Sequence, residues 1–207
     1  MPLQNRVDPF GALVATPARG MFLGNRGGRF HRDDQTLGRR RWASRQWICC
    51  VLHFKNRHHE VWRNRYTALF FLDEVTAFAA GHRPCFECRR ADAKAFAEKW
   101  AHAKRSTVPR APAMDLVLQA ERLDGRAKRS HDMPISDLPD GAFVTLQEKP
   151  NVAFAVRGSH LLRWDFAGYA EKIARPRGMA KVLTPPSIVS VLAAGYPPQW
   201  HPSAGEL

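Results

Sequence analysis

Cysteine is scarce in this chain, with four residues among 207. Two of them are adjacent, at Cys49 and Cys50, and the other two enclose two residues, at Cys85 and Cys88. Small secreted domains that depend on disulfides carry a denser framework of cysteines. We therefore expect reduced thiols, a core large enough to need no covalent link, and a cytoplasmic location.

Long hydrophobic runs are also missing. No stretch reaches about 18 uncharged apolar residues, and residues 1–20 lack the apolar core of a signal peptide. The chain contains no P-loop, no Gly-x-Ser-x-Gly elbow, no His-Glu-x-x-His motif and no dinucleotide fingerprint. We expect no membrane partner and none of the enzyme classes that these motifs mark.

Acidic residues are outnumbered, with 19 Asp and Glu against 32 Lys and Arg and a formal net charge of +13. Residues 1–110 hold 21 of the basic and 9 of the acidic residues, so nearly all of the excess lies in the first half. A generic basic surface is the alternative, but it does not account for this asymmetry. The charge distribution therefore predicts a nucleic-acid partner for the first half.

Apolar segments of strand length and alanine-rich segments of helix length both occur, which predicts an α+β fold. Strands are expected at 47–54, 66–72, 141–146, 153–156 and 161–164, and helices at 73–80, 91–104, 114–130 and 184–194. The segment 105–113 contains two prolines and is a candidate linker. We expect a basic α/β module at residues 1–104 and a mixed α+β part at 114–207, with one fused domain as the alternative.

Cys85-Phe86-Glu87-Cys88 is the most specific chemical signal in the sequence. Two thiolates with this spacing can bind one zinc ion when the backbone turns tightly between them. Neighbouring arginines favour the thiolate forms of both residues. A thioredoxin-like redox pair is disfavoured, because the motif follows a helix instead of leading from a strand into one. Two unrelated surface cysteines remain as the other alternative.

A family resemblance extends over roughly residues 28–90. Residues 69–89 read LFFLDEVTAFAAGHRPCFECR, and residues 28–33 read GRFHRD. Both segments resemble the Ada-type zinc-binding domain of DNA repair. The resemblance implies a zinc ion, DNA contact through basic residues, and a small α/β module supported by the metal. His31 and Gln35 stand where this family has two ligand cysteines, so its methyl-transfer reaction is not carried over.

The remaining ligands of the expected zinc site have to come from other segments. Adjacent residues of a strand point to opposite faces, so only one of Cys49 and Cys50 can reach the ion. The candidate ligands are Cys85, Cys88, Cys50 and His31. Non-ligand roles for Cys50 and His31 stay open. Further histidine candidates are His53, His58, His59 and His82.

Basic and aromatic residues are interleaved between residues 19 and 65, a segment that contains twelve Lys and Arg and three acidic residues. Cations neutralise phosphates and aromatic rings can stack on unpaired bases, although we expect most of these rings in the core. The glycine-rich segment 24–28 is expected to form a loop. The candidate nucleic-acid contacts are Arg26, Arg29, Arg39, Arg40, Arg41 and Arg45.

Segment 121–131 combines acids, a lysine and a histidine and is the candidate for catalysis. On the expected helix, Glu121, Asp124 and Lys128 share one face. Carboxylates beside an amine can transfer protons, and the amine can attack a sugar carbon. His131 completes the candidate set. A solvated helix face with internal ion pairs is the simpler alternative.

Three hypotheses for the function follow. The first is a zinc-containing nucleic-acid-binding protein, with DNA favoured over RNA, in the repair or processing of damaged DNA. The second is an enzyme acting on DNA, of the glycosylase, lyase or nuclease kind, that uses segment 121–131. The third is an RNA-associated or purely structural zinc module.

Overall fold

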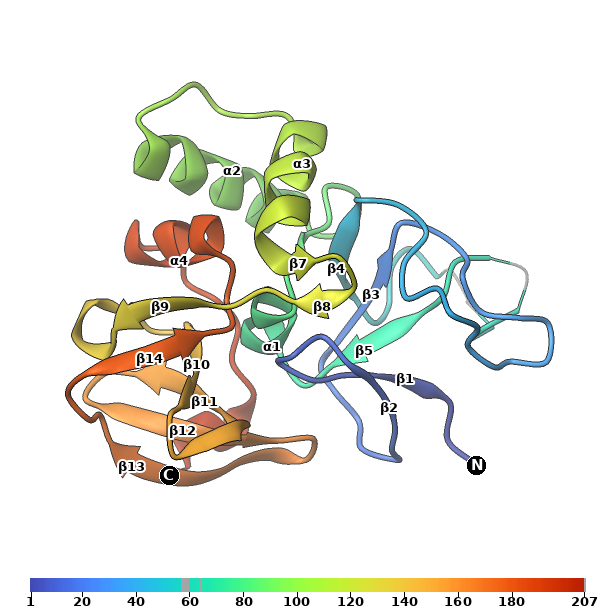
Figure 1. The fold of residues 1–207 in the computed structure, drawn as a ribbon. Coiled ribbons are helices and arrows are strands. Elements are labelled where there is room, and N and C mark those ends of the chain that lie inside the picture. Colours follow the sequence, from blue (N-terminus) through green and yellow to red (C-terminus); the bar gives the residue numbers. More distant parts are fainter. Residues whose placement is uncertain (57–59, 64, 207) are drawn as a thin grey trace.

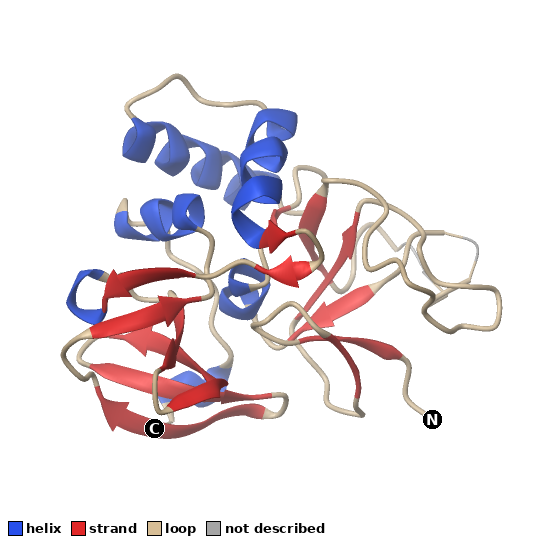
Figure 2. Cartoon of the chain, viewed as in Figure 1, coloured by secondary structure: helices blue, strands red, loops and turns tan. Residues whose placement is uncertain are grey.

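Two six-stranded sheets lie side by side in the computed structural model (Figure 1). Above them in this view lie helices α2 (Arg90–Lys104), α3 (Ala111–Arg122) and α4 (Pro186–Ala193). The structure describes residues 1–56, 60–63 and 65–206, and in these residues it has four helices and three mostly antiparallel sheets. Helices and strands are both distributed along the chain, so the predicted α+β class is confirmed (Figure 2). No described helix combines the length and the apolar character needed to cross a membrane.

The first sheet is formed by the N-terminal part of the chain in the order β2-β1-β5-β3-β4-β6. Its strands span Leu13–Ala15, Gln4–Val7, Leu69–Phe71, Phe22–Arg26, Trp47–Val51 and Arg83–Pro84. The continuous apolar character of β4 predicts a strand covered on both faces, and β4 lies between β3 and β6. β6 runs parallel to β4, with Cys49 opposite Pro84. This pairing brings the segment after β6 to β4.

β3 extends further than the sequence predicts. Residues 24–26 belong to this strand and not to a loop, because all five residues of β3 pair with β4. Gly24 permits this pairing, since a Cβ at its position would lie 2.2 Å from the carbonyl oxygen of Ile48. The expected loop is thereby reduced to Gly27 and Gly28, which both have positive φ.

Helix α1, Glu74–Ala79, begins and ends where the sequence predicts. The Asp73 carboxylate accepts a hydrogen bond of 2.8 Å from the backbone N–H of Thr76, which caps the helix. Gly81 follows the helix with a φ of +83° and turns the chain toward β6. Every residue of α1 is buried, so this short helix lies inside the molecule.

The helical prediction for 114–130 is wrong in its second half. α2 spans Arg90–Lys104, close to its predicted limits, whereas α3 spans Ala111–Arg122 and begins inside the expected linker. A hairpin follows α3, with β7 at Leu123–Asp124 and β8 at Ala127–Lys128. Gly125 lies at its turn with a φ of +58°, a conformation that no α-helix continues.

The second sheet has the order β13-β12-β11-β10-β14-β9 and is antiparallel. Its strands span Gly168–Ala174, His160–Asp165, Lys149–Arg157, Phe143–Leu146, Met179–Val182 and His131–Pro134. β10, β11 and β12 agree with the predicted strands, whereas the sequence does not predict the other three. Helix α4, Pro186–Ala193, follows β14, and 3-10 turns lie at Ile135–Asp137 and Pro202–Gly205.

Buried side chains connect the two parts of the chain across the expected linker. α1 contributes Val75 and Ala79 to a cluster with Phe143, Leu162 and Tyr169 of the second sheet. A second cluster joins side chains of α2 and α3 to side chains of α4. The N-terminal and C-terminal parts therefore share two hydrophobic clusters.

Candidate metal centre and cationic pocket

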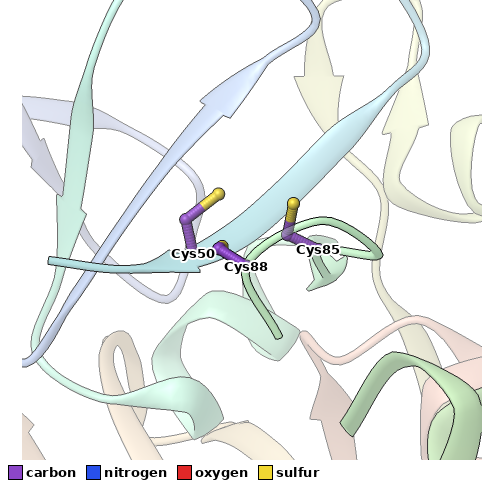
Figure 3. Close-up of side chains that lie close together, drawn as sticks. All are labelled: Cys50, Cys85 and Cys88. Atoms are coloured by element: carbon purple, nitrogen blue, oxygen red, sulfur yellow. The ribbon is translucent and has the colours of Figure 1, made fainter. Parts of the chain in front are cut away.

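Three of the four cysteines come together beside β4 (Figure 3). Cys50 lies on this strand, and Cys85 and Cys88 lie in the loop between β6 and α2. The backbone N–H of Cys85 donates a 3.0 Å hydrogen bond to the carbonyl of Cys49, which continues the pairing of β6 with β4 into the loop. The three Sγ atoms lie within 4.8 Å of one another. The three cysteines are therefore close enough to hold a metal ion.

The three thiols lie close enough to affect one another's ionisation. Contacts with Cys50 and then with Cys88 lower the pKa of the Cys85 thiol, whereas contacts with Cys85 and Cys88 raise the pKa of the Cys50 thiol. The backbone N–H of Glu87 lies 3.4 Å from the Cys85 sulfur and donates to it. Thiolate ligands bind zinc, copper(I) and iron–sulfur clusters in preference to hard cations. The donor set is thus compatible with zinc.

Cys49 lies on the opposite face of β4 and belongs to the core. Its side chain is fully buried, and its sulfur accepts a hydrogen bond of 3.5 Å from the Arg89 guanidinium. Burial raises the pKa of its thiol. The alternation of side chains along β4 therefore assigns Cys50, and not Cys49, to the metal group.

His31 is not brought to the three sulfurs, although it belongs to the predicted ligand set. Its ring stacks on Trp62, with the ring centroids 5.3 Å apart. Nδ1 lies 2.9 Å from the hydroxyl of Thr67, and Nε2 lies 3.0 Å from the carbonyl oxygen of Arg63. Both ring nitrogens thus bind to groups of Arg63 and Thr67. The Cys3His arrangement with His31 is not what the structure contains.

The other histidines add no fourth ligand within the described part of the chain. His53 is exposed, His82 is fully buried in a different cluster, and His58 and His59 lie outside the described residues.

A cavity of about 260 Å³ opens beside the three sulfurs and is also lined by Tyr66. Burial, and then the neighbouring cysteines, raise the pKa of this tyrosine to about 12.

A second cavity, of about 420 Å³, lies between the first sheet, α3 and the hairpin, and we call it the cationic pocket. Arg26 of β3 and Arg122 of α3 lie over the Trp47 ring, with guanidinium carbons 4.0 and 3.9 Å from its centroid. No acidic residue lines this pocket in the described chain. Its charged lining residues are Arg26, Arg41, Arg122, Arg126 and Lys128.

The two buried arginines of the pocket donate only to neutral acceptors in the described chain. Arg26 donates to the carbonyl of Gly11 at 2.9 Å and to Nε2 of His82 at 3.4 Å. Arg122 donates to the carbonyl of Gly81 at 2.9 Å. Burial lowers the pKa of each guanidinium to about 9. Nε of Arg122 and Nδ1 of His82 are buried without a hydrogen-bond partner.

Lys128 reaches the same pocket from β8, where its amine donates a hydrogen bond to the carbonyl of Ala79. Burial, and then the charges of Arg26 and Arg122, lower the pKa of this amine to about 7. The charge of Asp8 partly offsets this lowering of the Lys128 pKa, and burial raises the pKa of the Asp8 carboxyl. The pocket therefore concentrates positive charge, which the nearby Asp8 carboxyl offsets only in part.

The predicted arginine cluster is exposed and adjoins the cationic pocket. A hollow of about 230 Å³ is lined by Arg39, Arg40, Arg41, Trp42, Ala43 and Arg126. Three of these residues, Arg41, Trp42 and Arg126, line the cationic pocket as well. The hollow and the pocket therefore form one continuous basic region.

The other predicted nucleic-acid contacts lie in different surroundings. Arg29 is exposed and forms an ion pair with Asp33. Arg45 is also exposed, and in the sequence it follows shortly after the residues that line the hollow. Arg26 is only 2% exposed, because β3 includes it and turns it into the interior. It lines the cationic pocket and does not belong to an exposed loop.

The four residues predicted for catalysis lie on different elements, although Glu121 and Lys128 are both near enough to affect the pKa of His131. Glu121 accepts two hydrogen bonds from the first turn of α4, and Asp124 is exposed at the hairpin. Lys128 lines the cationic pocket, and His131 begins β9. The cause is the end of α3 at Arg122, which removes the helix face that three of these residues were expected to share.

Two residues of the cationic pocket, Trp47 and Arg122, were missed as functional candidates. Met114, Leu118 and Arg122 follow one another at intervals of four along α3, and all three are buried. An arginine in line with the apolar residues of a helix is a signal for a buried charge. The contact of Trp47 with two arginines has no such signal, because the three residues come from separate elements.

Comparison with family models, curated proteins and solved structures found no match to the chain. The resemblance to the Ada-type domain therefore stays a prediction. The function has to be argued from the cysteine group and from the basic region described above.

Proposed function

We propose that this protein binds nucleic acid, DNA in preference to RNA, and takes part in the repair or processing of damaged DNA. The main support is the exposed cluster Arg39–Arg41, which shares its hollow with Arg126 from the hairpin after α3. Two distant segments thus combine arginines on one surface, and no acidic residue lines the hollow in the described chain. Such a surface suits a run of phosphates, and the partly exposed Trp42 ring offers a surface for base stacking.

In this proposal the metal has a supporting role. A zinc ion held by Cys50, Cys85 and Cys88 would tie β4 to the loop that precedes α2. The first residue of β4 is Trp47, over which two arginines of the cationic pocket lie. Fixing β4 therefore fixes one wall of the basic region, so removal of the metal is expected to weaken DNA binding.

The salt dependence of DNA binding tests the surface. Affinity for a fluorescent duplex is measured between 50 and 200 mM salt, a range over which each neutralised phosphate contributes about 0.9 to the logarithmic slope. Replacing Arg39, Arg40 and Arg41 together by alanine is expected to weaken binding and to reduce the slope by about 2 to 3. RNA of the same sequence, as competitor, is expected to displace the duplex less well than DNA does.

The matched control removes three exposed positive charges elsewhere, with Lys104, Lys149 and Arg177 replaced by alanine. This variant has the same net charge as the arginine variant but keeps the hollow. Equal losses of affinity in both variants would show that binding follows net charge alone, and would contradict the proposed surface. Incubation with abasic, uracil-containing and alkylated duplexes shows whether a damaged strand is preferred and whether it is changed.

A further inference from the structure

The cationic pocket differs from the exposed arginine cluster because two of its charges, on Arg26 and Arg122, are buried. Arg26 is 2% exposed and Arg122 is 0% exposed, and Lys128 is half-buried beside them. Buried cations ordinarily pair with carboxylates, because an unpaired charge in a protein interior is strongly unfavourable. Here no acidic residue of the described chain lines the pocket, and the hydrogen bonds that the three cations donate go to neutral acceptors. Asp8 interacts with Arg26 and Lys128 only through space.

These cations keep N–H groups that make no hydrogen bond within the described chain. Nε of Arg122 is buried and has no hydrogen-bond partner among the described residues. The Lys128 amine makes one hydrogen bond, to the carbonyl of Ala79, and a charged amine carries three N–H groups. Trp47 and the backbone carbonyls hold both guanidinium groups in place, so the donors are already oriented before a ligand arrives.

Three cations around one cavity match an anion that carries more than one charge. A phosphate monoester has a charge of about −1.5 to −2 near pH 7 and three terminal oxygens, whereas a diester within a strand has a single charge. Guanidinium groups bind phosphate oxygens through paired hydrogen bonds. The cavity, of about 420 Å³, is large enough for a small-molecule site.

We propose that the cationic pocket binds a phosphate monoester, and that this monoester is the terminal phosphate of a nucleic-acid strand. Arg26 and Arg122 hold its oxygens, and Lys128, whose charged form a bound anion favours, supplies the third positive charge. Trp42 lines both the pocket and the hollow, so the strand continues past this ring onto Arg39–Arg41. The identity of the strand rests on the proposed function, whereas the recognition of the phosphate rests on the pocket alone.

Binding to strand ends provides the test. Affinity is measured for single-stranded DNA of one sequence that ends in a 5′-phosphate, in a 3′-phosphate or in hydroxyl groups only. Inorganic phosphate and a nucleoside monophosphate are measured in parallel. Lys128→Met removes one charge of the pocket and one hydrogen bond to the backbone, whereas Arg26 and Arg122 each donate to two backbone carbonyls. Arg129→Met is the matched control, since Arg129 is exposed on the same hairpin.

DNA with one of the two phosphorylated ends is expected to bind the native protein about tenfold more tightly than DNA that ends in hydroxyl groups. This is the gain in affinity expected from one hydrogen bond to a charged group. Lys128→Met should lose most of this difference and keep its affinity for the hydroxyl end, whereas Arg129→Met should keep both. Equal affinity of the native protein for all ends would overturn the inference and leave the proposed function intact. Equal losses in the two variants would also overturn it, as a general effect of charge.

The parallel probes separate the two proposals. Lys128-dependent binding of inorganic phosphate and the monophosphate, with no binding of any oligonucleotide, would support a phosphate pocket and overturn the proposed function. A monophosphate that binds as tightly as the phosphorylated strand would overturn the assignment to a strand end in favour of a free nucleotide.

Discussion

The pKa of the Lys128 amine depends strongly on the neighbouring residues. Burial and the charges of Arg26 and Arg122 lower the pKa of its amine to about 7, against about 10.4 in an unfolded chain. Between these two values the unfolded chain binds a proton that the folded chain has lost. The free energy of unfolding therefore rises with pH across this window.

The first prediction concerns this pH dependence. The free energy of unfolding of the native protein is expected to increase from pH 7 to pH 9, with a contribution from Lys128 below about 1.4 kcal/mol per pH unit, the limit for one proton. Lys128→Met should reduce the slope, and the exposed Arg129→Met should leave it unchanged. Urea unfolding at a series of pH values measures it. Identical slopes in all three proteins would show that Lys128 is not perturbed.

The second prediction compares the two adjacent cysteines of β4. Cys50→Ser removes one of the three sulfurs and is expected to reduce bound zinc from about one ion per chain to a small fraction, because zinc then keeps two thiolate ligands. Cys49→Ala removes a buried sulfur on the opposite face and should keep the metal at a modest cost in stability. Metal analysis of both purified variants decides, and equal zinc contents would contradict the assignment of Cys50.

At the scale of single elements, helix α1 has only six residues but connects the two parts of the chain. The Asp73 carboxylate before it bonds to the N–H and the hydroxyl of Thr76, and also accepts from the Tyr169 hydroxyl and the N–H of His201. One buried side chain thus caps a helix of the N-terminal part and binds two segments of the C-terminal part.

The third prediction follows from these four hydrogen bonds. Asp73→Ala is expected to lower the free energy of unfolding by roughly 3 kcal/mol, because it removes the helix cap and leaves buried donors without partners. Asp165→Ala removes an exposed carboxylate that accepts one hydrogen bond, from Ala167 in a turn, and should cost less than about 1 kcal/mol. Denaturant titrations measure both, and similar losses would contradict the linking role of Asp73.

Local signals explain which elements can be predicted from the sequence. α1 is predictable because Asp73 and Gly81 mark its two ends, and the choice of Cys50 over Cys49 follows from the alternation along β4. The hairpin after α3 also had a signal, since Asp124-Gly125 is a typical two-residue turn. The helix expected over residues 114–130 runs through this turn, so the turn signal was outweighed by the helical pattern.

Long-range contacts explain what the sequence cannot predict. The partners of the His31 ring, Trp62 and Thr67, are chosen by the folded chain and have no pattern around His31 that announces them. The meeting of Arg26, Trp47 and Arg122 likewise joins three separate elements. The charge excess of the first half was visible in the sequence, but its division into an exposed cluster and a buried pocket was not.

At the scale of the whole molecule, the two parts of the chain are expected to unfold together. They share two hydrophobic clusters, and Asp73 connects them through hydrogen bonds. Calorimetry should therefore show a single transition with equal calorimetric and van't Hoff enthalpies. If the three cysteines hold a metal ion, chelation should lower the temperature of that one transition, because such an ion would bind the folded chain and not the unfolded one. Two separate transitions would show that the parts are independent domains.

The surroundings of Glu74 set an order of events during synthesis. Its carboxylate is fully buried and meets Arg89 at 2.8 Å, but it also accepts hydrogen bonds from the Tyr196 hydroxyl and the N–H of Gln199, which lie 122 and 125 residues further along the chain. A ribosome has to add those residues before the charge at Glu74 is fully enclosed. The first sheet and its cysteines therefore leave the exit tunnel before the carboxylate of Glu74 can be fully enclosed.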